Sequence, residues 1–180
     1  SIKDINGLKM RAQAPAGEIF SALGASTVTI PGEEVYPSLQ RGVVDAAEYI
    51  DDIVNYGQGL HEVTKYVIFP TYSGGGTVDW IVNAKSWAAL PDDLKAIVDL
   101  ALRTTNFNFW NKAVVGELEA QRKVLEYGNE FITWSKEDMD ELTRVRLKIM
   151  REKAAKNPDY KARFESQVRF LEKLGYTFKE

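Results

Sequence analysis

The 180-residue sequence contains no cysteine and a single histidine, His61. The lack of cysteine excludes disulfide scaffolds, thiolate zinc sites and cysteine nucleophiles. With one histidine, neither a Ser-His-Asp catalytic triad nor a metal site made of several histidines is readily built. Most hydrolase mechanisms are therefore disfavoured, and we expect His61 to be a surface residue or a residue whose hydrogen bonds are satisfied.

An excess of basic residues and long apolar runs are also lacking. The formal net charge is −3, whereas nucleic-acid-binding surfaces concentrate Lys and Arg to neutralise phosphates, so we expect no nucleic-acid partner. No run approaches the ~18–20 apolar residues that span a bilayer, and residues 1–4 do not begin a signal peptide. Hydrophobic residues make up 44% and charged residues 27%, which is typical of a folded globular protein.

The sequence does contain a regular alternation of strand-like and helix-like segments. The segments that favour strands are residues 8–12, 26–30, 43–49, 62–69, 77–83 and 130–134. Helical patterns separate the first three of these strands, which predicts a small parallel sheet covered by helices, and hence an α/β fold class. Ser135 followed by Asp138 is close to the capping-box pattern and predicts that another helix begins there.

The longest predicted helix begins at Pro91 and continues to about residue 127, where Gly128 ends it. Proline at the first position, followed by Asp92 and Asp93 in the first turn, is a strong start signal. At ~1.5 Å per residue, such a helix is longer than a small lobe is wide. We therefore expect it to pack along more than one surface.

Several short motifs follow one another in a fixed order. They are Gly-Leu-Lys-Met-Arg at residues 7–11, Leu-Gly-Ala at 23–25, Glu-Val-Tyr at 34–36, Gly-Val-Val-Asp-Ala-Ala-Glu-Tyr at 42–49 and Ala-Ala-Leu-Pro-Asp-Asp-Leu at 88–94. As an ordered set, they resemble the solute-binding proteins of TRAP transporters, the periplasmic receptors of tripartite ATP-independent uptake systems for organic acids. The Ala-Glu-Tyr ending is most similar to the branch that binds 2-oxo acids and other monocarboxylates.

The resemblance implies a two-lobe fold like that of type II periplasmic binding proteins, and a periplasmic location. Residues 1–76 would form the α/β core of the second lobe, and residues 77–116 a crossing strand and the first part of the long helix. Residues 117–180 would return to the second lobe and end in C-terminal helices. Family members have a large region before the Gly-Leu-Lys-x-Arg strand, so we expect this chain to be a C-terminal fragment, prone to self-association and weak in solute binding.

The resemblance also implies a binding site. Arg11 matches the family arginine that grips the carboxylate of the solute, and guanidinium offers two parallel donors to a carboxylate. Glu48 and Tyr49 match the pair that the family places in the pocket at the end of the third strand. Tyr72 and Trp80 (and Gly32 with them) lie at loop and strand ends facing the expected cleft. The alternatives are a surface arginine at position 11 and core positions for the aromatic residues.

No cofactor is required by this function, but the 2-oxo acid branch holds a metal ion beside the solute. A sodium or calcium ion would suit Glu48 and Tyr49, because hard cations take carboxylate and backbone oxygens. The same branch draws a further acidic ligand from a loop that corresponds to residues 72–76, which contain no acid. Asp51, Asp52 or Asp79 are alternative ligands, and they are equally typical of plain surface acids.

The predicted function is therefore that of a receptor subunit and not of an enzyme. It would bind a small organic acid anion, a 2-oxo or 2-hydroxy monocarboxylate, and deliver it to the TRAP membrane permease subunits. One alternative is a structural domain that forms a homodimer or a domain-swapped oligomer, since some receptors of this branch exchange C-terminal helices. The other is an acid–base enzyme that uses Glu48 with a neighbouring aspartate.

Overall fold

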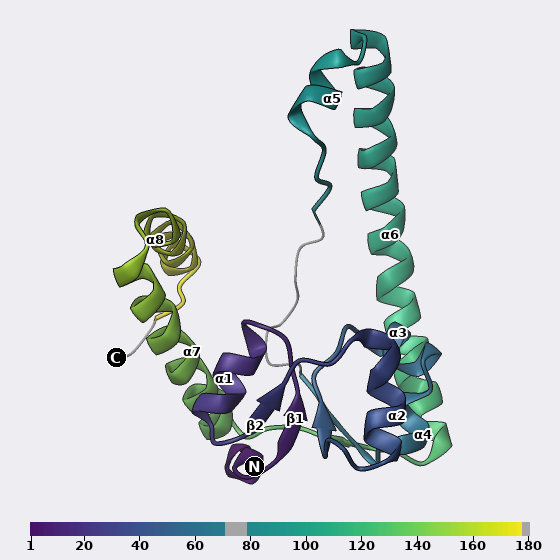
Figure 1. The fold of residues 1–180 in the computed structure, drawn as a ribbon, viewed down its shortest axis with the longest axis vertical. Coiled ribbons are helices and arrows are strands. Elements are labelled where there is room, and N and C mark those ends of the chain that lie inside the picture. Colours follow the sequence, from purple (N-terminus) through teal and green to yellow (C-terminus); the bar gives the residue numbers. More distant parts are fainter. Residues whose placement is uncertain (71–78, 178–180) are drawn as a thin grey trace. The chain divides into compact units, whose positions relative to one another are not determined.

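The computed structural model describes residues 1–70 and 79–177 of the chain (Figure 1). The chain divides into two compact units. Unit 1 comprises Ser1–Tyr49, Tyr66–Pro70 and Phe131–Glu180, and unit 2 comprises Ile50–Lys65 and Thr71–Glu130. Each unit is described by itself. No helix in the described ranges is long and apolar enough to cross a membrane.

A three-stranded parallel sheet organises unit 1, as the first three strand-like segments predict. Strand β1 (Lys9–Arg11) lies between β2 (Ser26–Val28) and β3 (Ala46–Ala47). Both neighbours run parallel to β1, with Met10 opposite Thr27 on one side and Ala46 on the other. The carboxyl ends of the three strands therefore lie at one edge of the sheet, and Arg11 is the last residue of the middle strand.

Short helices connect these strands and bury apolar side chains. Helix α1 (Ala16–Ala22) buries Ile19 and Phe20, and α2 (Val35–Gln40), which follows the 3₁₀ turn η2 (Gly32–Glu34), buries Val35 and Leu39. A glycine follows each helix with positive φ, +97° at Gly24 and +67° at Gly42. This conformation is nearly free of strain in glycine alone, which explains why the helices end there.

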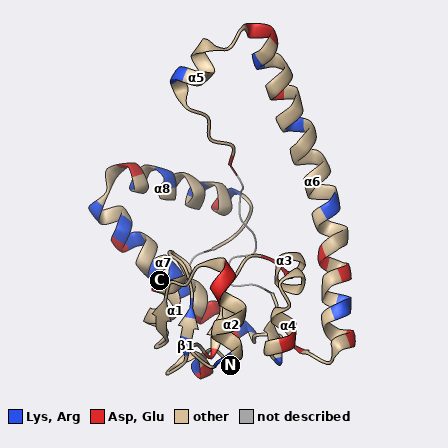
Figure 2. Cartoon of the chain, turned by 45° about the vertical axis from the view of Figure 1, so that its right-hand side comes forward, with Lys and Arg blue, Asp and Glu red and all other residues tan. Residues whose placement is uncertain are grey.

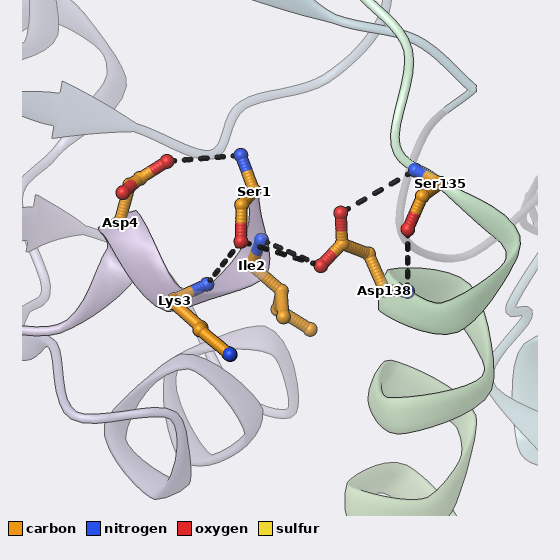
Figure 3. Close-up of polar contacts among 6 residues, drawn as sticks. All are labelled: Ser1, Ile2, Lys3, Asp4, Ser135 and Asp138. Carbon is orange, nitrogen blue, oxygen red and sulfur yellow. Dashed lines mark hydrogen bonds and ion pairs between the residues drawn. The ribbon is translucent and has the colours of Figure 1, made fainter.

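The predicted helix start at Ser135 is confirmed. Helix α7 (Lys136–Lys156) opens with a complete capping box, in which Ser135 Oγ accepts from Asp138 N and the Asp138 carboxylate accepts from Ser135 N. Asp138 also accepts from Ile2 N at 3.0 Å, which ties the 3₁₀ turn η1 (Ile2–Ile5) to α7 (Figure 3). Helix α8 (Pro158–Lys173) follows, and charges of both signs alternate along α7 and α8 (Figure 2).

The predicted strand over residues 62–69 is wrong in its first half. Helix α4 (Leu60–Val63) occupies residues 60–63, and only β4 (Tyr66–Ile68) pairs, with β5 (Glu130–Ile132). Burial of Leu60 and the side chain of Asn129 favour the helix. Asn129 Nδ2 donates to the carbonyl oxygens of His61 and Thr64, at 3.1 and 2.7 Å, which satisfies acceptors at the end of α4.

Unit 2 is helical in its described part, with α3 (Asp52–Gly57), α4, α5 (Ala84–Ala89) and α6 (Asp92–Tyr127). The 36 residues of α6 confirm the predicted long helix, and Gly128 closes it with a φ of +111°. The strand expected over residues 77–83 is not found where the structure describes this segment. Residues 79–83 pair with no other described strand, and the Asn83 side chain instead accepts from the first amides of α5.

His61 lies in unit 2 between two tyrosine rings. Its imidazole stacks on Tyr56 at a centroid distance of 4.4 Å and meets the edge of Tyr127 at 4.8 Å. His61 is half-buried, and within the described ranges its buried Nδ1 makes no hydrogen bond, so its hydrogen bonds are not all satisfied as one of the two expectations had it. Ring packing at the junction of α4 and α6 contributes to holding this side chain.

Candidate functional site

The candidate site of unit 1 is built around the buried guanidinium of Arg11. The residue is 3% exposed, and a buried charge is costly unless its donors are satisfied. Nε donates to the carbonyl oxygen of Ile30 at 3.1 Å, and Nη1 donates to that of Glu48 at 2.5 Å. These acceptors lie at the ends of the segments that carry β2 and β3. The sheet edge itself therefore fixes the plane of the guanidinium.

Glu48 approaches the same guanidinium with its side chain. Its backbone N–H donates to the Arg11 carbonyl at 2.8 Å, which extends the pairing of β1 with β3 by one bond. Its Oε2 lies 3.7 Å from Arg11 Nη1. Partial burial raises the pKa of the Glu48 carboxyl, while a hydrogen bond from the backbone of Gln13 and the charge of Arg11 oppose this rise. Glu48 is therefore an ion-pair partner of Arg11 at a distance longer than a hydrogen bond.

Tyr49 covers Arg11 from one side. The Arg11 Cζ lies 5.0 Å from the centroid of the Tyr49 ring, a distance typical of a cation–π contact. The Tyr49 hydroxyl lies against the backbone of Gly32, where a β-carbon would come within 2.4 Å of the oxygen. Tyr49 thus lies between the guanidinium of Arg11 and the backbone of Gly32.

Among the residues that the structure describes, one terminal nitrogen of Arg11 has no protein partner. Neither the hydrogen bonds nor the ion pair of Arg11 within residues 1–70 and 79–177 involve Nη2. Since Nε is held by Ile30, the two terminal nitrogens form the edge that can still donate. An in-plane carboxylate at this edge would receive two parallel N–H groups, the geometry that makes arginine–carboxylate pairs strong.

The structure thus brings three of the five predicted site residues together, namely Arg11, Glu48 and Tyr49. Trp80 belongs to unit 2, where it is 56% exposed and donates from Nε1 to Asn106 Oδ1 at 3.2 Å. Tyr72 lies outside the described residues. The roles of Trp80 and Tyr72 in a pocket stay predictions.

The metal ligands considered from the sequence are found in different settings. Asp51 caps α3 by accepting from Val54 N at 2.7 Å, and Asp52 accepts from Gln121 Nε2 at 2.7 Å. Both carboxylates thus serve helix packing in unit 2. Across the described ranges, no three His, Cys, Asp or Glu side chains gather where a metal ion could be held. Glu48 supplies one half-buried carboxylate and Tyr49 a hydroxyl and a carbonyl, which is a partial set for a hard cation.

Sequence reasoning missed the groups that orient Arg11. The carbonyl oxygens of Ile30 and Glu48 belong to the backbone, so no side-chain pattern identifies them. Gly32 was expected at the cleft, but its contact with the Tyr49 hydroxyl depends on a fold that brings residues 32 and 49 together. The position of Arg11 at the end of the middle strand was the available signal.

A family comparison identifies the class of this fold and site. The model of the family "Bacterial extracellular solute-binding protein, family 7" (DctP) matches residues 1–157. The chain belongs to this family, the solute-binding proteins of TRAP transporters. Because this is a family of binding proteins and not of enzymes, the acid–base alternative for Glu48 is set aside.

Individual relatives are similar over nearly the whole chain. A monocarboxylate 2-oxoacid-binding periplasmic protein of Nostoc sp. is 29% identical over 175 residues, which are 97% of this chain and 48% of the relative. A TRAP solute-binding protein of Bordetella bronchiseptica is 30% identical with a TM-score of 0.89, over 97% of this chain and 52% of that structure. It is a mixed-occupancy dimer with copurified calcium and picolinate in one active site and an apo second site.

A third relative is a TRAP solute-binding protein of Pseudoalteromonas atlantica with bound sodium and pyruvate. It is 25% identical with a TM-score of 0.73, over 97% of this chain and 55% of that structure. The chain therefore spans about half the length of the relatives that it matches. The α/β fold agrees with that of these receptors over the shared half.

Proposed function

We propose that this chain forms part of a periplasmic TRAP receptor in which Arg11 clamps the carboxylate of a small organic acid anion. The observation that carries the proposal is the state of Arg11. Its guanidinium is buried and oriented by two backbone carbonyls, while Nη2 has no partner in the described part of the chain. The receptor would deliver the acid to the membrane permease subunits of its transporter.

The chemistry around Arg11 favours an anion. Nη1 and Nη2 are both donors, and the carboxylate of Glu48 stands 3.7 Å from Nη1, beyond hydrogen-bond distance. An incoming carboxylate would complete the hydrogen bonding of Nη2 and balance the buried charge. Because the protein holds the guanidinium in place beforehand, little conformational entropy is lost when the acid binds.

The relatives support a monocarboxylate with a 2-oxo or 2-hydroxy group. The Nostoc protein is named for monocarboxylate 2-oxoacid binding, and the Pseudoalteromonas structure holds pyruvate. Picolinate, in the Bordetella structure, is also a monocarboxylate and carries a nitrogen acceptor next to its carboxylate group. A single donor edge at Arg11 fits one carboxylate.

A calcium or sodium ion beside the acid belongs to the same proposal, since two of the relatives carry one. Here Glu48 would supply a carboxylate oxygen and Tyr49 a further oxygen, and the remaining ligands would come from the acid and from residues outside this set. When bound, such an ion stabilises the negative charge of Glu48 and of the acid.

The test is isothermal titration of the full gene product with pyruvate, lactate, picolinate and succinate. We expect the monocarboxylates to bind more tightly than succinate. Arg11→Ala should weaken their binding by about a hundredfold or more, because loss of a buried charged donor costs 2–5 kcal/mol or more. Arg11→Lys, which keeps the charge but loses the planar pair of donors, should fall in between.

Arg41→Ala is the matched control, because Arg41 is an exposed arginine of unit 1 that pairs with Glu34 at 3.9 Å. Thermal melts of each variant separate loss of binding from loss of folding. Binding that is unchanged in Arg11→Ala, or no binding of any of the four acids by the unaltered protein, would contradict the proposal.

The metal is tested by repeating the titration with pyruvate in calcium, in sodium and after treatment with EDTA. If Glu48 is a calcium ligand, EDTA should weaken binding by the unaltered protein and have a much smaller effect on Glu48→Gln. If it is a sodium ligand, replacing sodium by choline should do the same. Equal and non-zero sensitivity of the two proteins to removal of the ion would assign that ion to other ligands.

A further inference from the structure

Gly32 is in close contact with the aromatic residue that covers Arg11. It opens the turn η2, directly after Pro31. A β-carbon at Gly32 would lie 2.4 Å from the Tyr49 hydroxyl oxygen, 3.4 Å from Cζ and 3.6 Å from Cε2. The first distance is far below van der Waals contact, and the other two are tolerable. The hydroxyl alone therefore requires the absence of a side chain at position 32.

The backbone conformation does not require glycine at this position. Positive φ angles among the described glycines occur at residues 7, 24, 42, 59, 128 and 175, and Gly32 is not one of them. Alanine would fit the backbone of the turn without strain in φ. The reason for glycine at position 32 lies instead in the space that it leaves for Tyr49.

The position of the Tyr49 ring in turn affects Arg11. Its ring centroid lies 5.0 Å from the guanidinium carbon, and the residue follows Glu48, whose carbonyl oxygen accepts from Arg11 Nη1. A displaced Tyr49 ring would withdraw its cover from the guanidinium and move the adjoining carbonyl acceptor. The direction in which Nη1 and Nη2 point would change with it.

We propose that Gly32 is a positioning residue of the acid-binding site. Because it has no side chain, Gly32 leaves room for the Tyr49 hydroxyl, so that the Tyr49 ring can hold the Arg11 guanidinium in the orientation that binds the carboxylate. The effect of Gly32 on acid binding rests on the proposed function of Arg11. The contact between Gly32 and Tyr49 does not depend on that function, since it can be measured without any ligand. Gly32 touches neither the acid nor Arg11 in this scheme.

A double-mutant cycle tests the proposal on the full gene product, with pyruvate and picolinate as probes. Gly32→Ala should weaken binding about tenfold, a loss that isothermal titration resolves easily. Tyr49→Phe removes the one atom that the new methyl group would strike. In the Tyr49→Phe background, Gly32→Ala should therefore change the affinity by no more than about twofold, the scatter expected when no coupling remains.

Gly57→Ala is the control, because no atom lies within 4 Å of a β-carbon there and Gly57 has no positive φ. It should leave both affinities unchanged. If Gly32 serves only the stability of its turn, alanine there will cost the same affinity in both backgrounds, and the proposal fails. The proposal also fails if Gly32→Ala alone has no effect.

A second readout needs no ligand. The Arg11 Nε–H, which donates to Ile30 O, should give a slowly exchanging NMR signal whose position reflects the ring current of Tyr49. Gly32→Ala should shift this signal, and Gly57→Ala should not. If the unaltered protein binds neither probe, the proposed function fails while the Arg11 signal still decides whether Gly32 positions Tyr49. An unshifted signal in Gly32→Ala would overturn the positioning role whatever the titrations show.

Discussion

Unit 1 and unit 2 differ sharply in how much apolar surface they bury. Unit 1 holds all but three of the buried hydrophobic residues of the described ranges, and those three are Leu60, Ala120 and Val124. In α6 of unit 2, six large apolar residues are each at least 60% exposed: Ile97, Leu100, Phe107, Phe109, Trp110 and Leu118. Unit 1 is thus a packed scaffold that can orient Arg11, whereas α6 leaves large apolar side chains uncovered, and exposed apolar surface favours association.

The largest expected effect is the difference between two truncations, each of one large apolar side chain, made in unit 1 and in unit 2. Leu142 in α7 is 1% exposed, and Trp110 in α6 is 69% exposed. Leu142→Ala should lower the free energy of unfolding by about 2–5 kcal/mol, because it removes buried contacts and leaves a cavity. Trp110→Ala should stay within about 0.5 kcal/mol. Urea denaturation followed by circular dichroism measures both, and equal losses would remove the contrast between the units.

Self-association of the 180-residue chain should be the next largest effect. Sedimentation velocity at several concentrations should show a species larger than a monomer, because association removes the exposed apolar side chains of α6 from water. Phe107→Ser with Trp110→Ser should shift the distribution towards monomer.

Phe170→Ser in α8 is the control for that experiment, since Phe170 is 61% exposed but belongs to unit 1. A shift with Phe170→Ser alone would assign the contact to the C-terminal helices. A clean monomer at all concentrations would show that the exposed α6 residues do not drive association.

A smaller effect is expected from Asp138 in unit 1. Hydrogen bonds from the backbone of Ile2 and from Ser135 lower the pKa of this carboxyl in the folded protein. The stability that it provides is therefore present above its unfolded pKa and is lost as the pH falls through the lower, folded value. As the pH is lowered from about 5 to about 2, the melting temperature should fall less steeply for Asp138→Asn than for the unaltered chain. Identical slopes would remove Asp138 from the acid response.

The smallest effect, with the opposite sign, is expected from Glu117 in unit 2. Burial raises its pKa, as does the charge of Asp51, against a hydrogen bond from Asp52 N. Its contribution to stability is complete below the unfolded pKa and is lost as the pH rises through the higher, folded value. Above about pH 5, the melting temperature of Glu117→Gln should therefore be slightly higher than that of the unaltered chain. At low pH the two melting temperatures should be equal. A lower melting temperature near neutral pH would contradict this sign.

The local signals in the sequence predicted much of the fold. Proline and acids at residues 91–93, the Ser135–Asp138 pair and the glycines at 24, 42 and 128 act within one turn of chain, and each marks a helix end in the structure. The errors arose where distant contacts override local preference. The β-branched character of residues 62–69 favours a strand, but burial of Leu60 and capping by Asn129 place a helix at its start.

The residues of the candidate site also divide into those that the sequence indicated and those that it did not. The resemblance to the family pointed to Arg11, Glu48 and Tyr49, and the structure brings these three residues together. The carbonyl acceptors at Ile30 and Glu48 could not be predicted, because they depend on the register of the sheet and carry no side-chain signature. Whether Trp80 and Tyr72 complete the pocket remains a prediction for the same reason: they lie far along the chain from this sheet.

The single histidine gives unit 2 a built-in reporter. Because no other imidazole exists in the sequence, the two ring C–H resonances of His61 can be assigned in a one-dimensional proton spectrum without isotope labelling. Two tyrosine rings, of Tyr56 and Tyr127, surround that imidazole, so its chemical shifts record whether α4 remains docked on the end of α6. A partner that covers this end of α6 can then be followed by watching one residue.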